Sequence, residues 1–168
     1  MRIRPATDSD LPAILAIYNH EIATGTAIYV NEPETLGQRA EWFAAKRAAG
    51  LPVLVLEDEE GVAGFCSYGP FRSQAGFRSC VEHSLYVTEN RRGRGYGKLL
   101  LSALIDDAVM RGMHTMIAAI DAENQRSIAL HAGFGFNLVG QLPEVARKFD
   151  RWLDLVLLQK TLEGPNLP

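Results

Sequence analysis

Cysteine is scarce in this chain of 168 residues, and positive charge is not in excess. Cys66 and Cys80 are the only cysteines and lack the paired spacing of a metal site, so we interpret both as small core or strand residues. Acidic residues number 20 against 17 Lys and Arg, a net charge of −3. A general nucleic-acid-binding surface is therefore not expected.

Long apolar runs are also missing. No run approaches the roughly 18 residues that cross a membrane. The N-terminus, Met-Arg-Ile-Arg-Pro-Ala-Thr-Asp, lacks the apolar core of a secretion signal. We therefore expect a cytoplasmic protein without a membrane partner. Apolar residues still make up 47% of the chain, enough for one domain with a real core. We place that domain at residues 1–162, followed by a frayed tail at 163–168.

Hydrophobic periodicity and turn signals predict strands and helices in a mixed order. The expected strands cover residues 2–5, 53–57, 62–68, 81–87, 113–121, 136–140 and 153–160. The expected helices cover residues 8–20, 36–49, 96–111 and 124–132. This order is typical of a mixed α/β fold. Because a helix connects strands 81–87 and 113–121, these two strands should be parallel.

The most informative stretch is residues 80–99, where an alternating strand leads into a glycine-rich loop that opens a helix. The loop directs backbone N–H groups and the positive end of a helix toward one point, which suits a phosphate or pyrophosphate. Four cations gather there on an otherwise acidic protein: Arg91, Arg92, Arg94 and Lys98. Such a local cluster favours a specific anionic ligand.

Two common phosphate-binding motifs do not fit this loop. A dinucleotide fingerprint that starts at Gly93 needs glycine at position 98, where Lys98 stands. A P-loop that ends at Gly97-Lys98 fails because position 92 is Arg and Leu99 replaces the hydroxyl that binds magnesium. A nucleotide-binding switch is therefore disfavoured, and we expect no metal.

The segment Arg92-Gly-Arg-Gly-Tyr-Gly97 matches the pattern Arg/Gln-x-x-Gly-x-Gly/Ala. It resembles the pyrophosphate loop of the GNAT family of N-acetyltransferases, which bind acetyl-coenzyme A. The opening at residues 3–11 and the segment Asn124–His131 with Gly135-Phe136 are similar to other parts of that family. The resemblance covers residues 3–162. It implies an α/β fold with a mixed, mostly antiparallel sheet, splayed at the acetyl-CoA site and flanked by helices.

Three shorter segments resemble one branch of that family, the phosphinothricin and methionine sulfoximine acetyltransferases. They are Pro70-Phe-Arg72, Val81-Glu-His-Ser84 and Glu144–Asp154. The resemblance implies that acetyl-CoA donates its acetyl group to the α-amine of a small amino-acid-like substrate. Methionine sulfoximine, methionine sulfone and phosphinothricin are substrates of this type. It also implies a cytoplasmic homodimer.

The implied reaction needs a base, because an α-amine is mostly protonated at pH 7. Glu82 is the candidate: it lies in the strand that enters the glycine loop and shares a strand face with Ser84 and Tyr86. Many family members have a tyrosine that reprotonates the leaving thiolate, at the position where this chain has His131. His131 can donate a proton at neutral pH, or it is a buried helix histidine without a catalytic role. Tyr86 is a weaker alternative donor.

The resemblance also assigns the residues that hold acetyl-CoA. These are Leu85, Tyr86, Val87, Arg92, Gly93, Arg94, Gly95, Tyr96, Gly97, Lys98, Asn124, Ser127 and Gly133. The backbone of 85–87 is expected to pair with the pantetheine arm and to supply the N–H that stabilises the carbonyl oxygen. Asn124 is also a good helix N-cap, and the two roles are compatible.

An amino-acid substrate needs a cation for its carboxylate, and Arg72 in the loop 69–79 is the natural candidate. The full set of candidate substrate-binding residues is Tyr29, Arg72, Ser73, Gln74, Ala75, Glu82 and His83. His83 points to the opposite strand face from Glu82, where we favour a core role. Arg147, Lys148 and Trp152 face either a partner subunit or the substrate entrance.

Two other functions stay open at this point. A peptide or protein N-terminal acetyltransferase would need an open, polar groove, and the aromatic residues of the loop 69–79 argue mildly against one. A non-catalytic acyl-CoA-binding sensor would keep the cofactor loop without a working base, and the presence of Glu82 argues against that.

Overall fold

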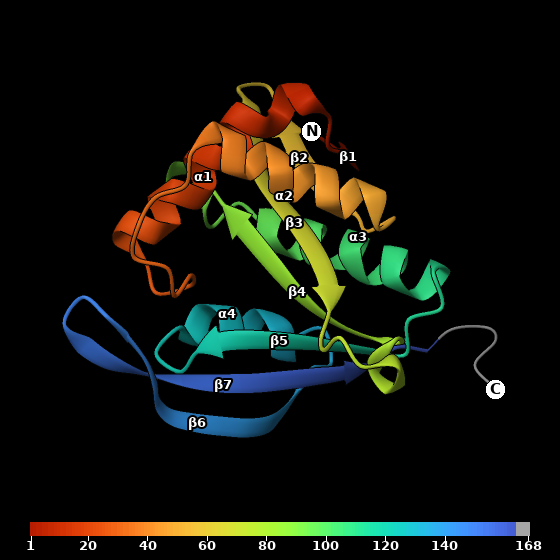
Figure 1. The fold of residues 1–168 in the computed structure, drawn as a ribbon, viewed down its shortest axis with the longest axis vertical. Coiled ribbons are helices and arrows are strands. Elements are labelled where there is room, and N and C mark those ends of the chain that lie inside the picture. Colours follow the sequence, from red (N-terminus) through yellow and green to blue (C-terminus); the bar gives the residue numbers. More distant parts are fainter. Residues whose placement is uncertain (164–168) are drawn as a thin grey trace.

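The computed structural model describes residues 1–163 of the chain (Figure 1). A seven-stranded sheet is formed by β1 (Arg2–Pro5), β2 (Val53–Asp58), β3 (Gly61–Pro70), β4 (Cys80–Val87), β5 (Thr115–Asp121), β6 (Asn137–Lys148) and β7 (Arg151–Thr161). The helices are α1 (Leu11–Thr24), α2 (Leu36–Ala48), α3 (Tyr96–Met110) and α4 (Gln125–Ala132). No helix in this part of the chain is long and apolar enough to cross a membrane. Of the tail that we expected to fray, all but Glu163 lies outside the described residues.

The strand order is β1-β2-β3-β4-β5-β7-β6. Neighbouring strands are antiparallel except for β4 and β5, which are parallel. This is the pair that the helical connection through α3 predicted. The expected mixed α/β fold with a mostly antiparallel sheet is therefore confirmed.

Alternation along the strands divides the apolar residues between two cores. Val55 and Phe65 pack with α1 and α2, whereas Leu56 and Cys66 belong to the core that includes α3. Figure 1 shows α1 and α2 in front of β2 and β3, with α3 behind them. Because a shift by one residue would exchange the two strand faces, the burial of both sets fixes the register.

The strands β4 and β5 separate after a short stretch of pairing. Their register runs from Cys80 opposite Thr115 to His83 opposite Ala118, where the recorded pairing ends. In Figure 1, β4 then turns upward, away from β5. The sheet is therefore splayed beyond His83 and Ala118, and the splay opens next to the loop that precedes α3.

The first helix begins and ends later than predicted. A 3-10 turn at Asp8–Asp10 precedes α1, and the Asp10 carboxylate accepts the backbone N–H of Thr7 (2.7 Å). The helix α1 continues past His20 to Thr24. Its last turns contain the buried residues Glu21 and Ile22, which tertiary packing holds in helical form.

The extent of β6 was also wrongly predicted, since the expected strand 136–140 is in fact Asn137–Lys148. Its register with β7 is interrupted between Leu142 and Ala146, around Pro143. A proline is tolerated here because β6 is the edge strand of the sheet. The irregularity breaks the alternation of polar and apolar residues, so no strand signal continued beyond Gly140.

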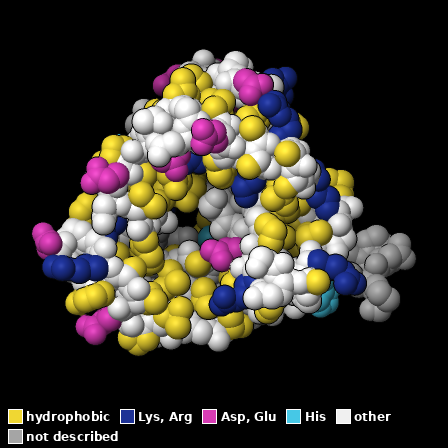
Figure 2. All heavy atoms as spheres, viewed as in Figure 1, with side chains coloured by type: hydrophobic (Ala, Val, Ile, Leu, Met, Phe, Trp, Pro, Cys, Tyr) yellow, Lys and Arg dark blue, Asp and Glu magenta, His cyan; other side chains and the backbone are white. Residues whose placement is uncertain are grey.

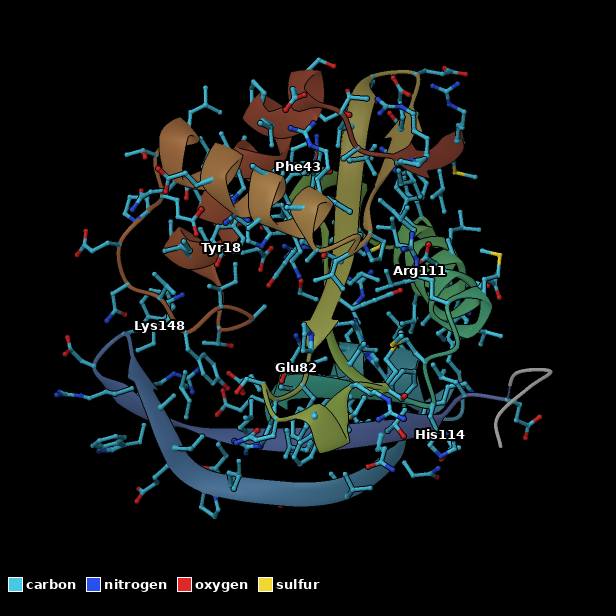
Figure 3. All side chains as sticks on the ribbon, turned by 45° about the vertical axis from the view of Figure 1, so that its right-hand side comes forward. Tyr18, Phe43, Glu82, Arg111, His114 and Lys148 are labelled. Carbon is cyan, nitrogen blue, oxygen red and sulfur yellow. The ribbon has the colours of Figure 1, made fainter. Side chains whose placement is uncertain are left out.

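The tip of the β6–β7 hairpin is fastened to the loop between α1 and α2 (Figure 3). There the buried Lys148 ammonium donates hydrogen bonds to the carbonyl oxygens of Gly25 (2.8 Å) and Ile28 (2.7 Å). Lys148 therefore contacts its own chain and closes the fold beside the splayed strands. Arg147 and Trp152, by contrast, are exposed.

Candidate active site

A cavity of about 650 Å³ opens beside the glycine loop that precedes α3. The predicted acetyl-CoA residues that line it are Leu85, Tyr86, Val87, Arg92, Gly93, Gly95, Tyr96, Gly97, Lys98, Asn124 and Ser127. Arg94 and Gly133 are not part of its wall. The structure therefore brings most of the predicted cofactor residues together around one space.

Two glycines give the loop its shape. Gly93 and Gly95 have φ angles of +86° and +84°, a left-handed conformation that side chains rarely adopt. Gly95 is also the N-cap of α3, whose first backbone N–H groups have no acceptor within the helix. At Gly97, a Cβ atom would come within 3.3 Å of the Leu130 side chain. The loop therefore presents bare amides at the positive end of a helix, an arrangement that suits pyrophosphate.

Asp58, at the end of β2, braces this loop. Its carboxylate accepts a hydrogen bond from Arg91 (2.8 Å) and another from the Tyr96 hydroxyl (3.0 Å). Arg91 is buried, and its charge is neutralised by ion pairs with Asp58 and Glu60. Of the four cations in the predicted cluster, Arg91 therefore supports the loop.

Arg92 is held at the edge of the cavity by two groups. Its guanidinium forms an ion pair with the buried Glu21 of α1 and donates a hydrogen bond to the Val87 carbonyl oxygen (3.2 Å). Burial and the nearby Arg126 cation lower the pKa of Arg92. Arg126 lies on the same cavity wall, next to Gly93. The sequence reasoning missed both Glu21 and Arg126, although Arg126 belongs to the segment quoted for the family resemblance.

A second cavity, of about 310 Å³, adjoins the first across the splayed strands. Figure 2 shows the molecule hollowed between α2 and β5. Residues that line both cavities include Leu85, Tyr86, Asn124 and Ser127. Further predicted residues in the wall of the second cavity are Tyr29, Glu82, His83 and His131. Asp121, which the sequence reasoning did not single out, also lines it.

Glu82 faces this second cavity from β4 (Figure 3). Pairing with β3 and β5 on either side fixes its backbone, and it shares a strand face with Ser84 and Tyr86, as predicted. Burial raises the pKa of the Glu82 carboxyl, and the Arg72 cation opposes that rise. A carboxylate with a raised pKa is suited to accept a proton near neutral pH.

Tyr86 lies where the two cavities meet. Its ring packs against Phe65 (centroids 5.1 Å apart) and edge-on against Tyr18 (5.9 Å). Burial raises the pKa of its hydroxyl, so the hydroxyl keeps its proton at neutral pH. Tyr86 is therefore a fixed, protonated residue in the wall of both cavities.

The buried His131 pairs with the half-buried His83 on the opposite face of β4. The Nδ1 atom of His131 lies 2.7 Å from the carbonyl oxygen of Ser127, and its Nε2 atom lies 3.1 Å from Nε2 of His83. Burial lowers the pKa of both imidazoles, that of His83 to about 3, so both are neutral at pH 7. Because a carbonyl can only accept, the single N–H of His131 belongs to Nδ1 and points at Ser127.

The loop residues predicted to bind substrate lie outside the wall of the second cavity. They are Arg72, Ser73, Gln74 and Ala75, all exposed. The Arg72 guanidinium stands 5.2 Å from the ring centroid of Phe71, which in turn packs edge-on against Phe77. Arg72 still acts electrostatically on Glu82, whose pKa it lowers. The structure therefore associates Arg72 with the base, although not with the cavity wall.

Comparison with known proteins gives a family and relatives along the whole chain. The model of the acetyltransferase (GNAT) family matches residues 14–136. The chain is 48% identical over 162 residues to the L-methionine sulfoximine/L-methionine sulfone acetyltransferase of Pseudomonas paraeruginosa. That match covers 96% of this chain and 94% of the relative.

Solved structures share the fold closely. A phosphinothricin acetyltransferase of the GNAT superfamily from Sinorhizobium meliloti, in complex with acetyl-CoA, superposes with a TM-score of 0.94 at 36% identity. The superposition covers 98% of this chain and 90% of the Sinorhizobium meliloti chain. A ribosomal-protein-alanine N-acetyltransferase from Brucella melitensis gives a TM-score of 0.95 at 48% identity, covering 96% and 100%.

Proposed function

Because this chain belongs to the acetyltransferase (GNAT) family, we propose that it transfers the acetyl group of acetyl-CoA to the α-amine of a small amino-acid-like substrate. Methionine sulfone, methionine sulfoximine and phosphinothricin are the substrate types, as the names of its relatives suggest. One observation carries the proposal: a loop suited to pyrophosphate and a cavity that holds a carboxylate of raised pKa meet at Leu85 and Tyr86. The active domain is residues 1–162, acting in the cytoplasm.

The cofactor's thioester supplies an activated acetyl group, and the chain's own residues position it. The amides of the loop 92–97 bind pyrophosphate, and Arg92, Lys98 and Arg126 contribute charge. After His83, the edge of β4 that faces β5 is unpaired, and it offers backbone groups to the pantetheine arm. A backbone N–H of this stretch stabilises the carbonyl oxygen as negative charge develops on it.

Glu82 is the general base. It removes one proton from the substrate's ammonium group, directly or through one water molecule, and so frees the lone pair of the nitrogen for attack on the thioester carbonyl. Burial favours this role, because a carboxylate of raised pKa holds the proton better than an exposed one. Positioning both reactants in adjoining cavities supplies much of the remaining rate.

The leaving thiolate takes a proton from the Tyr86 hydroxyl rather than from His131. Tyr86 lines both cavities, and its hydroxyl is protonated at neutral pH. The N–H of His131 is already donated to the Ser127 carbonyl, and the other ring nitrogen faces His83. The sequence favoured His131 over Tyr86 as the proton donor, and this proposal reverses that order.

The exposed face of β6 supports the proposal of a homodimer. Edge strands with exposed apolar side chains are natural surfaces for pairing with another chain. The exposed apolar residues of β6 are Leu138, Val139, Leu142 and Val145, and Trp152 of β7 is 59% exposed. Sedimentation velocity should give a dimer for the wild type and a monomer for Leu142→Asp, and a monomeric wild type would refute this part of the proposal.

The proposed substrate class is tested by offering a panel of acceptors to the wild-type enzyme. Release of free thiol from acetyl-CoA is measured with methionine sulfone, methionine sulfoximine, phosphinothricin and a peptide that begins with alanine. We expect turnover with the amino-acid analogues and mass-spectrometric detection of their N-acetyl products. Turnover with the peptide alone would favour the second candidate, a protein N-terminal acetyltransferase, which the 48% identity to a ribosomal-protein-alanine N-acetyltransferase supports.

A further inference from the structure

The carboxylate of Asp121 is buried at the end of β5, with one oxygen left without a partner. The residue is 2% exposed and lines the second cavity. Its Oδ1 atom accepts the backbone N–H of Glu123 (2.8 Å), whereas its Oδ2 atom has no hydrogen-bond partner among the described residues. A buried carboxylate oxygen without a donor is costly, so a donor from outside the chain is expected there.

The hydroxyl of Tyr29 is a second such group in the same cavity. It is buried and also has no hydrogen-bond partner in the described part of the chain. Burial, followed by the negative charges of Asp121 and Asp154, raises the pKa of Tyr29 to about 12. Tyr29 and Asp121 therefore lie close enough to interact electrostatically, with two polar groups available to one ligand.

Strand geometry places Asp121 on the same sheet face as Glu82. Glu82 is opposite Ile117 in the parallel register, and residues that differ by two along a strand share a face. Ile117 and Asp121 therefore face the same side of the sheet as Glu82. Asp121 lies beyond the last recorded pair, in the splayed part of the sheet, where the thioester would be held.

The acidic residues in the wall of the second cavity favour a positively charged ligand group. Among the described residues that line it, Glu82 and Asp121 are acidic and none is Lys or Arg. The two histidines in the wall, His83 and His131, are held neutral because burial lowers the pKa of each. The wall is thus doubly negative when both carboxylates are ionised. Arg72, the cation that acts on Glu82, stands outside the wall. An amino acid is complementary to this arrangement, with its ammonium group inside and its carboxylate outside.

We propose that Asp121, together with the Tyr29 hydroxyl, binds the acceptor's amino group in its ammonium form and holds it for deprotonation by Glu82. The inference deepens the proposed function and rests on it. An ammonium group has three protons, and the cavity offers one acceptor for each: Asp121 Oδ2, the Tyr29 oxygen and Glu82. Glu82 takes one of these protons, while Asp121 binds the ammonium group and is a substrate-binding residue.

The variant Asp121→Asn separates this role from a structural one. Oδ1 of Asp121 accepts the Glu123 N–H in a turn that asparagine forms equally well. The substitution therefore keeps the turn and the side-chain volume and removes the charge. Glu123→Gln is the matched control: it makes the same change of charge two residues away, at an exposed side chain paired with Arg151.

The experiment compares methionine sulfone with its desamino analogue, which keeps the carboxylate and the sulfone and lacks the amine. For Asp121→Asn we expect the KM for methionine sulfone to rise about 10- to 100-fold, the loss typical of a hydrogen bond to a charged group. The inhibition constant of the desamino analogue and the Kd for acetyl-CoA should stay unchanged. Tyr29→Phe should show the same selectivity with a smaller rise in KM, and Glu123→Gln should resemble the wild type.

Each other outcome overturns a defined part of the account. If the wild type acetylates methionine sulfone but Asp121→Asn and Tyr29→Phe leave its KM unchanged, the inference fails and the proposed function stands. A rise in KM matched by an equal rise in the inhibition constant of the desamino analogue also overturns it, since the change is then structural. If the wild type acetylates no amino-acid analogue, the proposed function fails and the inference falls with it. Should Asp121→Asn not fold, Tyr29→Phe decides by the same comparison.

Discussion

The Nε2 atoms of His83 and His131 lie 3.1 Å apart, with the other nitrogen of His131 against the Ser127 carbonyl oxygen. Both rings are neutral, and the hydrogen-bond pattern is complete only if His83 donates from Nε2 to His131. His83 Nδ1 is then the unprotonated atom, and it is indeed buried without a partner among the described residues. The pair therefore fixes the contact between β4 and α4, and neither ring has a proton free for the thiolate.

This arrangement predicts different effects for two candidate proton donors. Tyr86→Phe removes the hydroxyl of the proposed proton donor and should lower kcat about 100-fold, the lower end for general acid catalysis. His131→Gln should lower the melting temperature because it disrupts a buried pair, while kcat changes less than about threefold. Steady-state kinetics and thermal unfolding of both variants check this, and a larger loss of kcat in His131→Gln would reverse the assignment.

The ionisation of Glu82, the proposed base, should determine how kcat/KM depends on pH. Activity requires ionised Glu82, so kcat/KM should fall as the pH drops through the pKa of its carboxyl, which burial raises above the ordinary 4.5. Arg72 opposes that rise. Arg72→Ala should therefore move the acid limb to higher pH, besides raising the KM for amino acids. An acid limb that stays in place in Arg72→Ala would show that Arg72 and Glu82 do not interact.

Arg126 should contribute to cofactor binding. It lies beside Gly93 in the wall of the larger cavity, where its charge reinforces the loop amides. Arg126→Ala should raise the Kd for acetyl-CoA about 10-fold in isothermal titration, with the difference shrinking at high salt. Arg147→Ala, an exposed cation paired with Asp150, is the control and should bind as the wild type does. Equal affinities in all three proteins would contradict this role.

The ion pair between Arg4 and Asp10 should stabilise the fold in a pH-dependent way. Two short bonds from the Arg4 guanidinium (2.7 and 2.8 Å) lower the pKa of the buried Asp10 to about 2. Since the folded pKa lies below the unfolded value, the stabilisation is present above pH 4 and is lost as the pH falls toward 2. Asp10→Asn should lower the free energy of unfolding by about 2 kcal/mol at pH 7 and by progressively less below pH 4, as measured by urea unfolding. A cost independent of pH would point to another cause.

Local signals in the sequence were sufficient for much of the fold. The capping box at Thr35 and Gln38 and the glycine at position 50, with φ of +66°, bound α2 at Leu36–Ala48, within one residue of the predicted range 36–49. The strand–loop–helix order predicted that β4 and β5 are parallel. The length of the edge strand β6 was underestimated. Pro143 and the irregular register around it interrupt the two-residue period on which strand prediction depends.

The candidate site was most fully predictable where one contiguous segment carries it and least so where the fold assembles it. The glycine loop 92–97 is contiguous, so its residue pattern sufficed. Asp121, which was not predicted, reaches the cavity from another strand, whereas Tyr29, which was predicted, comes from a loop that the Lys148 ammonium fastens. His131 stands where many family members have a proton-donating tyrosine, so the sequence suggested a catalytic role. Its hydrogen bonds to Ser127 and His83 depend on tertiary packing and could not be predicted.

The most direct test of the central claim is thiol release from acetyl-CoA with methionine sulfone, for the wild type and Glu82→Gln side by side. The account predicts turnover by the wild type, a kcat at least about 100-fold lower in Glu82→Gln, and equal Kd values for acetyl-CoA. Equal kcat in the two proteins would contradict Glu82 as the base. Tight acetyl-CoA binding without turnover by the wild type would contradict the amino-acid substrate.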